Sequence, residues 1–292
     1  MTVGVTAVDM IDETVRQIEE MQTHSSSVVA IKAARALTTL TERDYPTVEA
    51  YVRTLERNSH ALQRANPSHA SLHTTQEDIV SRVKQANPAD VAEAKDVTLT
   101  AIDEVTTDVE HAKDRAGVRA AELIEDDDVL LLHDFSSTVM SALDEALDNG
   151  ASFEIYITES RPRMLGRKAA RQLSERDGID VTLVVDSAAG FYLPECDRLL
   201  LGMTCIVGDQ YYNRVGTYQI STAAVDSDVP ITVVGAESKL VDGAFAFKNE
   251  HRPVAEVMRE PADGFELANP AYDATPTRLI DTVVTDEQVY EY

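Results

Sequence analysis

The second half of the chain contains a series of short, unbroken apolar runs, and this feature limits the possible folds more than any other. The runs lie at residues 129–132, 153–157, 181–185, 198–201 and 231–234. Runs of this length are typical of strands that are buried on both faces of a parallel sheet. Helical stretches lie between them, at residues 138–147, 166–174 and 216–225. The alternation predicts an α/β fold with a Rossmann-like, doubly wound and mainly parallel sheet.

The first 120 residues show helical spacing instead. Apolar residues recur at every third or fourth position, as at Ile102 and Val105, and Thr47 precedes one such face as a candidate N-cap. The sequence therefore predicts an N-terminal helical domain at residues 1–122 and the Rossmann-like domain at residues 123–292.

The charge balance is strongly acidic, with 51 acidic residues against 26 basic ones and a net charge of −25. Because the acidic residues are spread along the whole chain, we interpret them as a solvated surface. Such a surface suits a cytoplasm of very high salt, where charge repulsion is strongly screened. The composition is typical of a salt-loving microbe such as a haloarchaeon. Direct binding of nucleic acid is disfavoured, since the sequence has no continuous basic stripe.

No apolar run approaches the roughly 20 residues that span a bilayer. The first 15 residues lack the basic and apolar segments of a signal peptide, so we expect a soluble, cytoplasmic protein. Cys196 and Cys205 are isolated thiols, which we interpret as small buried apolar residues. We expect no bound metal ion and no cofactor.

In open α/β sheets, ligands bind at the carboxyl ends of the strands. The segment after the second apolar run contains Arg161, Arg163, Gly166 and Arg167 between a strand and a helix. Guanidinium groups and the N-terminus of a helix both favour phosphate. We therefore predict an anion-binding loop here, with a basic surface loop as the alternative.

Other strand ends carry polar residues that belong either to the same site or to local structure. Asp134 follows the first run and is either a helix cap or a site carboxylate. Asn213 and Arg214 precede the helix after the fourth run, and Lys239 follows the fifth run. These three residues are candidates for a second polar contact with the same ligand, and local caps or surface ion pairs are the alternative.

Three segments in this order resemble the translation initiation factor 2B alpha/beta/delta family, which also contains ribose-1,5-bisphosphate isomerase and methylthioribose-1-phosphate isomerase. They are Arg161-Pro162 with Gly166-Arg167, Asn213-Arg214-Val215-Gly216-Thr217, and Asn269-Pro270-Ala271-Tyr272-Asp273-Ala274-Thr275-Pro276. The resemblance implies a helical N-terminal domain, a Rossmann-like C-terminal domain and a binding pocket between them. It also implies homodimers or higher homo-oligomers built on the C-terminal domain.

The sequence departs from the isomerases of this family at two positions. Asp134 stands where they carry a catalytic cysteine, and Thr204 stands where they carry a catalytic aspartate. A threonine hydroxyl cannot replace a carboxylate as a base at neutral pH. Our first hypothesis is therefore a regulatory protein of the initiation factor 2B type without catalysis. It would bind a nucleoside monophosphate or sugar phosphate in a retained phosphate pocket, with initiation factor 2 as a candidate partner.

The alternative hypothesis is a sugar-phosphate aldose–ketose isomerase of the ribose-1,5-bisphosphate isomerase type. In that case Asp134 acts as the base, because a carboxylate at a strand end can take a proton from a bound substrate.

Overall fold

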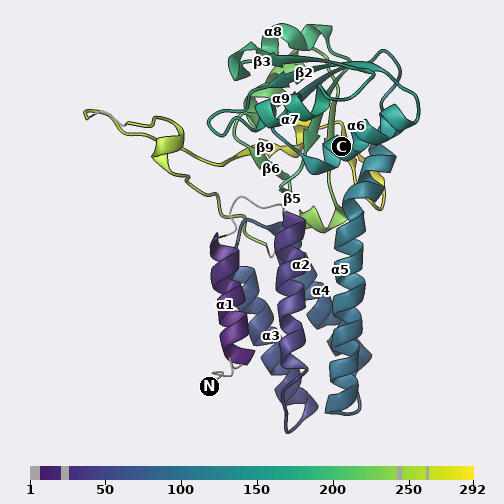
Figure 1. Cartoon of the computed structure of the whole chain (residues 1–292), viewed down its shortest axis with the longest axis vertical. Coiled ribbons are helices and arrows are strands. Elements are labelled where there is room, and N and C mark those ends of the chain that lie inside the picture. The colour runs from purple at the N-terminus through teal and green to yellow at the C-terminus, as the bar shows by residue number, and fades with distance from the viewer. Residues whose placement is uncertain (1–6, 21–25, 242–244, 261–262) are drawn as a thin grey trace. The chain divides into compact units, whose positions relative to one another are not determined.

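Long helices come first in the chain, and strands alternate with helices afterwards (Figure 1). The computed structural model describes residues 7–20, 26–241, 245–260 and 263–292. The chain divides into two compact units, residues 1–111 with 244–247 and residues 112–243 with 248–292. The predicted boundary between residues 122 and 123 stays a prediction, because a compact unit and an independently folding domain are different properties.

The helical unit has one apolar core, formed by the inward faces of its helices. Thr47 caps α3, since its Oγ1 accepts a hydrogen bond from the N–H of Ala50 over 3.2 Å, which confirms the predicted cap. The buried hydroxyl of Tyr51 lies 2.8 Å from Oγ1 of Thr98 and so has a partner in the core. The helices are α1 (Ala7–Glu20), α2 (Ser26–Ala36), α3 (Val48–Ala65), α4 (Ala70–Ala86) and α5 (Val91–Ala121), and the division between the units falls inside α5.

The Rossmann-like unit contains a seven-stranded sheet with the strand order β11-β10-β7-β4-β1-β2-β3. Neighbouring strands are parallel except for β10 and β11, which pair in opposite directions at one edge. This is the order of a doubly wound sheet whose direction of winding changes between β1 and β4, so the predicted fold class is confirmed. The strands are β1 (Val129–His133), β2 (Phe153–Thr158), β3 (Ile179–Val184), β4 (Arg198–Gly202), β7 (Ile231–Val234), β10 (Thr282–Val284) and β11 (Val289–Glu291).

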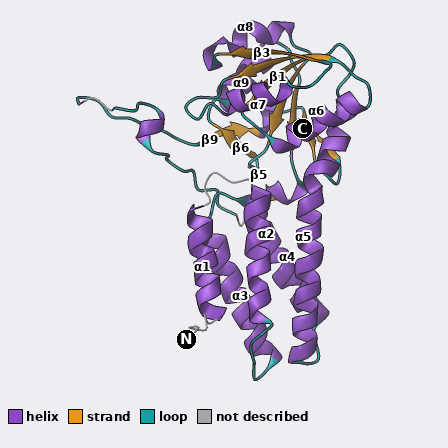
Figure 2. Cartoon of the chain, in the orientation of Figure 1, coloured by secondary structure: helices purple, strands orange, loops and turns teal. Residues whose placement is uncertain are grey.

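Helices cover both faces of this sheet (Figure 2). Alternate residues of β1 belong to different cores: Leu130 and Leu132 pack in the cluster that includes α6 and α7, whereas Leu131 packs in the cluster that includes α8 and α9. The alternation follows from the two-residue period of a strand, and it explains why the apolar runs are unbroken. The helices are α6 (Ser137–Asp148), α7 (Leu165–Leu173), α8 (Ala189–Tyr192) and α9 (Thr217–Asp226).

The third apolar run forms the edge strand β3, so the prediction that it is buried on both faces is wrong. Leu183 is 45% exposed and Val185, just after the strand, is 55% exposed. In this sheet β3 pairs only with β2. Apolar composition marked the run as a strand but carried no information on its place in the sheet.

A second, four-stranded sheet with the order β8-β5-β6-β9 was not predicted. Its strands are two to five residues long, too short for a pattern in the sequence to show. Asn213 and Arg214 lie in β6, whereas the sequence placed them at the start of the following helix, which begins at Thr217. The strands are β5 (Cys205–Val207), β6 (Gln210–Arg214), β8 (Leu240–Val241) and β9 (Tyr272–Pro276).

The segment between β8 and β9 is long and irregular. Its described part, residues 245–260 and 263–271, contains a single short helical turn at Val254–Glu256 and no strand. Among all the residues that the structure describes, no helix combines the length and apolar character needed to cross a membrane. The cytoplasmic location stays a prediction.

Gly202 allows β4 to approach the residue that caps α6. A Cβ added at Gly202 would lie 2.3 Å from the Cβ of Ser136, and Oγ of Ser136 accepts from the N–H of Val139. We expect Gly202→Ala to lower the free energy of unfolding by about 1–3 kcal/mol, because the cap has to shift. The matched control is Gly190→Ala, where the added Cβ meets only Ala223, at 3.9 Å. Urea unfolding followed by circular dichroism measures both, and equal stability of the two variants would contradict the packing argument.

Candidate functional site

Four segments of the Rossmann-like unit meet at the carboxyl edge of the seven-stranded sheet and enclose a small cavity. They are the residue after β1, the loop between β2 and α7, the end of β6, and the irregular segment before β9. The polar side chains of the cavity include Asp134, Ser160, Arg161, Arg163, Arg214 and Arg252. Its volume is about 20 Å³, which suits one water molecule. A larger ligand therefore enters only when these side chains move apart.

Two of the four arginines carry unsatisfied donors. The Nη1 atoms of Arg163 and Arg252 are buried and have no hydrogen-bond partner among the residues that the structure describes. The side chain of Arg252 is only 10% exposed. Burial, together with the charges of Arg214 and Arg252, lowers the pKa of Arg163. Buried donors without acceptors cost free energy, and an anion in the cavity would supply the missing acceptors.

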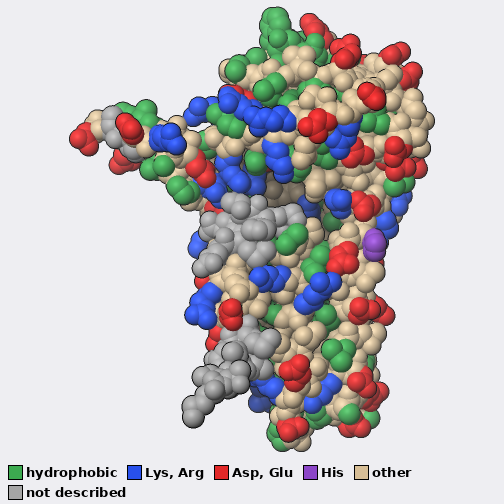
Figure 3. Space-filling view, in the orientation of Figure 1, with side chains coloured by type: hydrophobic (Ala, Val, Ile, Leu, Met, Phe, Trp, Pro, Cys, Tyr) green, Lys and Arg blue, Asp and Glu red, His purple; other side chains and the backbone are tan. Residues whose placement is uncertain are grey.

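Two carboxylates face the arginines. The Nε of Arg214 donates to Oδ2 of Asp134 over 3.2 Å, and the side chain of Asp134 is 11% exposed. Arg252 donates to Glu256 over 2.9 Å, and this hydrogen bond lowers the pKa of the Glu256 carboxyl. Four guanidinium groups against two carboxylates leave the cavity positive in a chain of net charge −25. On the face drawn in Figure 3, blue Lys and Arg side chains gather over part of the C-terminal unit.

The loop that carries Arg161 and Arg163 is held from the end of β3. The carboxylate of Asp186 accepts the N–H groups of Ser160 and Arg161, each over 2.7 Å. Ser160 has a φ of +60° and Asp134 a φ of +69°, in the left-handed region that side chains other than glycine rarely adopt. The Oγ of Ser160 accepts the N–H of Asp134 over 2.7 Å. Hydrogen bonds therefore connect the ends of β1, β2 and β3 and fix this strained backbone.

The N-terminus of α9 is already occupied by a carboxylate of the chain. Oδ2 of Asp273 accepts the N–H groups of Gly216 over 2.7 Å and of Tyr218 over 3.1 Å. A carboxylate at this position satisfies the free N–H groups and the positive end of the helix dipole. The guanidinium groups are consequently the available anion-binding groups at this edge.

The structure brings together four of the predicted site residues at the cavity: Asp134, Arg161, Arg163 and Arg214. Arg161 also donates from Nη2 to the carbonyl oxygen of Val257 over 3.0 Å.

The other predicted residues lie outside the lining. Arg167 forms an ion pair with Glu159 at 2.5 Å. Gly166 permits close packing, since an added Cβ would lie 1.7 Å from the carbonyl oxygen of Thr158. These two residues support the loop from outside and do not face the cavity.

Asn213, Thr204 and Lys239 are likewise engaged elsewhere. Asn213 is buried and donates to the hydroxyl of Thr217 over 3.2 Å. Thr204 lies between β4 and β5 and donates its N–H to the carbonyl of Tyr212 over 3.2 Å. The Nζ of Lys239 donates to the carbonyl of Met203 over 2.7 Å. Their predicted contacts with a ligand stay predictions.

Sequence reasoning did not select Ser160, Asp186, Arg252 or Glu256. Arg252 and Glu256 lie in the irregular segment before β9, which shows neither helical nor strand periodicity. A long segment of this kind inside a compact unit is frequently a functional loop, and that signal would have drawn attention to Arg252. Asp186 had no comparable signal, because its role depends on the edge position of β3.

Both cysteines are buried, as predicted. Burial raises the pKa of Cys196 and that of Cys205 to about 12. A thiol with such a pKa is protonated at neutral pH and is a poor nucleophile. Neither cysteine lines the cavity, and Asp134 is the one carboxylate among the described residues of its lining, since Glu256 pairs with Arg252 from outside the lining.

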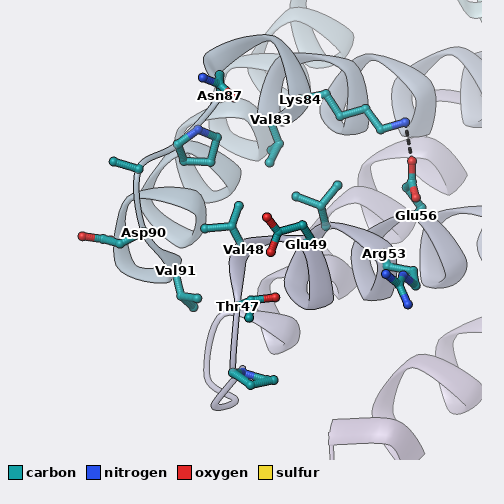
Figure 4. A pocket seen from close by; sticks show the side chains of 14 residues that line it. Thr47, Val48, Glu49, Arg53, Glu56, Val83, Lys84, Asn87, Asp90 and Val91 are labelled. Atoms are coloured by element: carbon teal, nitrogen blue, oxygen red, sulfur yellow. Dashed lines mark ion pairs between the residues drawn. The ribbon is translucent and has the colours of Figure 1, made fainter.

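A larger hollow of about 690 Å³ lies in the helical unit, between the start of α3, the end of α4 and the start of α5. Its charges are largely paired or used as caps. Lys84 forms an ion pair with Glu56 (Figure 4), and Asp90 accepts the N–H of Glu93 over 2.9 Å. Among the described residues that line this hollow, no buried guanidinium donor is without a partner, in contrast to the smaller cavity.

The chain is thus a two-part α/β protein. It has a helical unit and a doubly wound sheet with arginines at the carboxyl edge of the sheet. The Initiation factor 2 subunit family matches residues 22–291, and the chain belongs to this family, as the three sequence segments indicated. The crystal structure of translation initiation factor eIF-2B from Pyrococcus horikoshii OT3 is similar, with a TM-score of 0.77, 24% identity and 96% of each chain covered. The tetrameric eIF2B-beta2-delta2 complex from C. thermophilum gives a TM-score of 0.76 at 14% identity, with 96% of this chain and 90% of that chain covered.

Among curated proteins, the chain is 30% identical to a protein of Haloterrigena turkmenica named ribose 1,5-bisphosphate isomerase, over 94% of this chain and 88% of that one. It is 27% identical to a putative translation initiation factor eIF-2B subunit 2-like protein of Pyrococcus furiosus, over 94% and 95%. Six relatives at 28–30% identity over 94–98% of this chain carry the isomerase name.

These relatives overturn our first hypothesis, a regulatory protein without catalysis. That hypothesis rested on the loss of a cysteine and an aspartate from the family pattern. It gave too little weight to Asp134, whose carboxylate lines the arginine-lined cavity and accepts a hydrogen bond from Arg214. The relatives favour the alternative hypothesis, an isomerase.

The burial of Lys239 can be tested through the pH dependence of stability. Burial lowers its pKa from 10.5 to about 8. Between these pH values the unfolded chain keeps a proton that the folded protein has lost, so this residue makes stability rise with pH. We expect Lys239→Met to remove this rise. The free energy of unfolding of the variant minus that of the wild type should therefore decrease as pH increases from 8 to 10.5.

Urea unfolding at several pH values measures this difference. Both cysteines oppose the rise, and Cys196 cancels because it is the same in both proteins. The charge of Lys239 lowers the pKa of Cys205, so Lys239→Met is compared with its parent in a Cys205→Ala background. A constant difference between the variant and the wild type would show that Lys239 is solvated like a surface lysine.

Proposed function

We propose that the protein is a sugar-phosphate aldose–ketose isomerase and that ribose 1,5-bisphosphate is its substrate. One observation carries the proposal: the carboxylate of Asp134 lies in a cluster of arginines, two of which, Arg163 and Arg252, have a buried Nη1 without a partner among the described residues. The isomerase names of six relatives over nearly the whole chain give the reaction class. The arginines can bind the phosphate groups of the substrate, and the carboxylate can transfer the proton that the reaction moves.

Aldose–ketose isomerisation moves a proton between two adjacent carbons. In ribose 1,5-bisphosphate the phosphate on C1 keeps the sugar in its ring form, so the C1–O4 bond has to break and the ring oxygen takes up the proton that the C2 hydroxyl gives up as it becomes the ketone. A base takes the proton from C2 and returns it to C1, and a second group stabilises the negative charge that develops on oxygen. In this proposal Asp134 is the base. Arg163 and Arg214 stabilise the oxygen, because fixed positive charges in a water-poor cavity interact strongly with a developing anion.

The phosphate is held by the guanidinium donors that have no acceptor in the chain. Arginine can donate two parallel hydrogen bonds to one phosphate. Arg163 and Arg252 each offer a buried Nη1, and Arg161 adds a third guanidinium from the same loop as Arg163. Ligand entry opens the cavity, and the ion pair between Arg252 and Glu256 is exchanged for contacts with the phosphate.

We also propose that the protein assembles as a homodimer or higher homo-oligomer in the cytoplasm of a halophile. A tetrameric complex with the same fold supports assembly, and the acidic composition supports the salt-rich environment. The predicted partnership with initiation factor 2 belonged to the regulatory hypothesis and is not part of this proposal.

Replacing the base tests the chemistry. We expect Asp134→Asn to lower kcat for ketose formation from ribose 1,5-bisphosphate by about 10²–10⁴-fold, because an amide cannot accept the proton. The control is Glu159→Gln in the neighbouring loop, whose carboxylate pairs with Arg167 outside the cavity and whose loss should leave kcat nearly unchanged. The assay is run in high salt on the purified protein. Full activity of Asp134→Asn would remove Asp134 from the mechanism, and an inactive wild type would remove the proposed reaction.

Replacing the arginines tests the binding site separately. We expect Arg163→Gln and Arg252→Gln each to weaken the binding of inorganic phosphate by about 1.5–3 kcal/mol, since each removes charge-assisted hydrogen bonds. Arg167→Gln is the matched control, because its side chain is 45% exposed and pairs with Glu159. Isothermal titration calorimetry measures the affinities. An equal loss in all three variants would point to the general charge of the surface as the cause.

A further inference from the structure

A buried histidine lies directly beneath the arginine-lined cavity. His133 is the last residue of β1, is 3% exposed, and immediately precedes Asp134. Its ring contacts two neighbouring elements of the unit. The Nδ1 lies 2.6 Å from the hydroxyl of Thr158 at the end of β2, and the Nε2 lies 3.0 Å from the carbonyl oxygen of Val215 after β6.

The partners of the ring indicate which tautomer a neutral imidazole adopts here. A carbonyl oxygen can only accept a hydrogen bond, so Nε2 carries a proton and donates it to Val215. In the neutral ring Nδ1 is then an acceptor, and the hydroxyl of Thr158 donates to it. The opposite tautomer would leave Nε2 as an acceptor facing the carbonyl oxygen of Val215, which is also an acceptor.

The same ring is close to the residue that holds Asp134. The Oγ of Ser160 lies 3.5 Å from Nδ1 of His133 and 3.4 Å from the hydroxyl of Thr158. This Oγ accepts the N–H of Asp134 over 2.7 Å. His133 thus fixes the backbone at Asp134 from one side, through the chain, and Ser160 fixes it from the other.

Space for the ring is provided by Gly216, which follows Val215. A Cβ added at Gly216 would lie 2.8 Å from Cε1 of His133, and the φ of +106° at this position favours glycine. The connection that leads from Arg214 into α9 is consequently shaped around the imidazole. One ring ties the backbone next to Asp134 to the backbone next to Arg214.

We propose that His133 is a positioning residue, which with Thr158 holds the carboxylate of Asp134 against Arg214 in the cavity. The proposal rests on the proposed isomerase only where it concerns turnover. The placement of Asp134 is a separate statement about geometry, and it is measured without any reaction.

The effect on turnover is measured with variants of Thr158, which is fully buried. Thr158→Val keeps the shape of the side chain and removes the hydroxyl, whereas Thr158→Ser keeps the hydroxyl. We expect Thr158→Val to lower kcat by roughly 10- to 100-fold with little change in KM, because a small displacement of a catalytic group is costly. Thr158→Ser should restore most of the activity. His133→Gln keeps an amide donor for Val215 but places no acceptor at the position of Nδ1, so it should behave like Thr158→Val.

The placement of Asp134 is measured separately, by a double-mutant cycle that uses the binding of inorganic phosphate as the probe. Asp134 repels an anion held by the arginines, so Asp134→Asn should tighten phosphate binding about fivefold in the wild-type background. If loss of the Thr158 hydroxyl releases Asp134 from the cavity, the same substitution should change the affinity much less in the Thr158→Val background. Calorimetry of the four proteins gives this coupling, and the His133→Gln background provides a second cycle should Thr158→Val not fold.

The outcomes separate the two proposals. An inactive wild type with clear coupling in the phosphate cycle overturns the isomerase and supports the positioning role. Active wild type with no coupling and unchanged kcat in both Thr158→Val and His133→Gln overturns the positioning role. Parallel loss of kcat and phosphate affinity, not rescued by Thr158→Ser, also overturns it, because that result describes a general packing role for the side chain.

Discussion

The repulsion between guanidinium groups in a nearly closed cavity is the constraint on which the rest of the site depends. The charges of Arg214 and Arg252 both act on Arg163, and burial removes water that would screen them. The chain offsets part of this charge with Asp134 and Glu256 and leaves two Nη1 donors without acceptors. Such an arrangement is unfavourable in isolation, so the surrounding hydrogen bonds have to fix it.

These hydrogen bonds come from strand ends that are far apart in the sequence. Parallel strands place their carboxyl ends at one edge, and the winding order sets β1, β2 and β3 side by side. Asp186 then holds the loop of Arg161, and Ser160 holds the backbone of Asp134. Two consecutive strand ends adopt left-handed backbone conformations that are rare outside glycine. The strained backbone and the crowded arginines occur at the same place, and backbone strain of this kind clusters at functional sites.

The sequence allowed the α/β class, the parallel sheet and the helical N-terminal part to be predicted, because apolar periodicity reports burial directly. It located Asp134, Arg161 and Arg163, because polar residues after the parallel strands lie at the carboxyl edge. Arg214 was also selected, but from an expected helix start, whereas it ends β6 of the second sheet. It could not locate Arg252, since no periodicity connects the irregular segment before β9 with that edge. The small second sheet was also missed, because pairing between distant strands of two to five residues leaves no local pattern. Arg167 and Gly166 were selected for chemistry by their position, whereas the structure shows an ion pair and a close packing contact.

The path of the chain has a practical consequence. The helical unit is discontinuous in sequence, since it takes residues 244–247 from the middle of the C-terminal half before the chain continues to Arg252. Phe245 is 6% exposed and its ring packs at 5.2 Å against that of His73. No single cut can divide the polypeptide into the two units, and a fragment that starts after residue 111 would expose an aromatic side chain that normally sits among helices. In such a fragment, aggregation through the exposed Phe245 would be confused with a failure of the C-terminal unit to fold on its own.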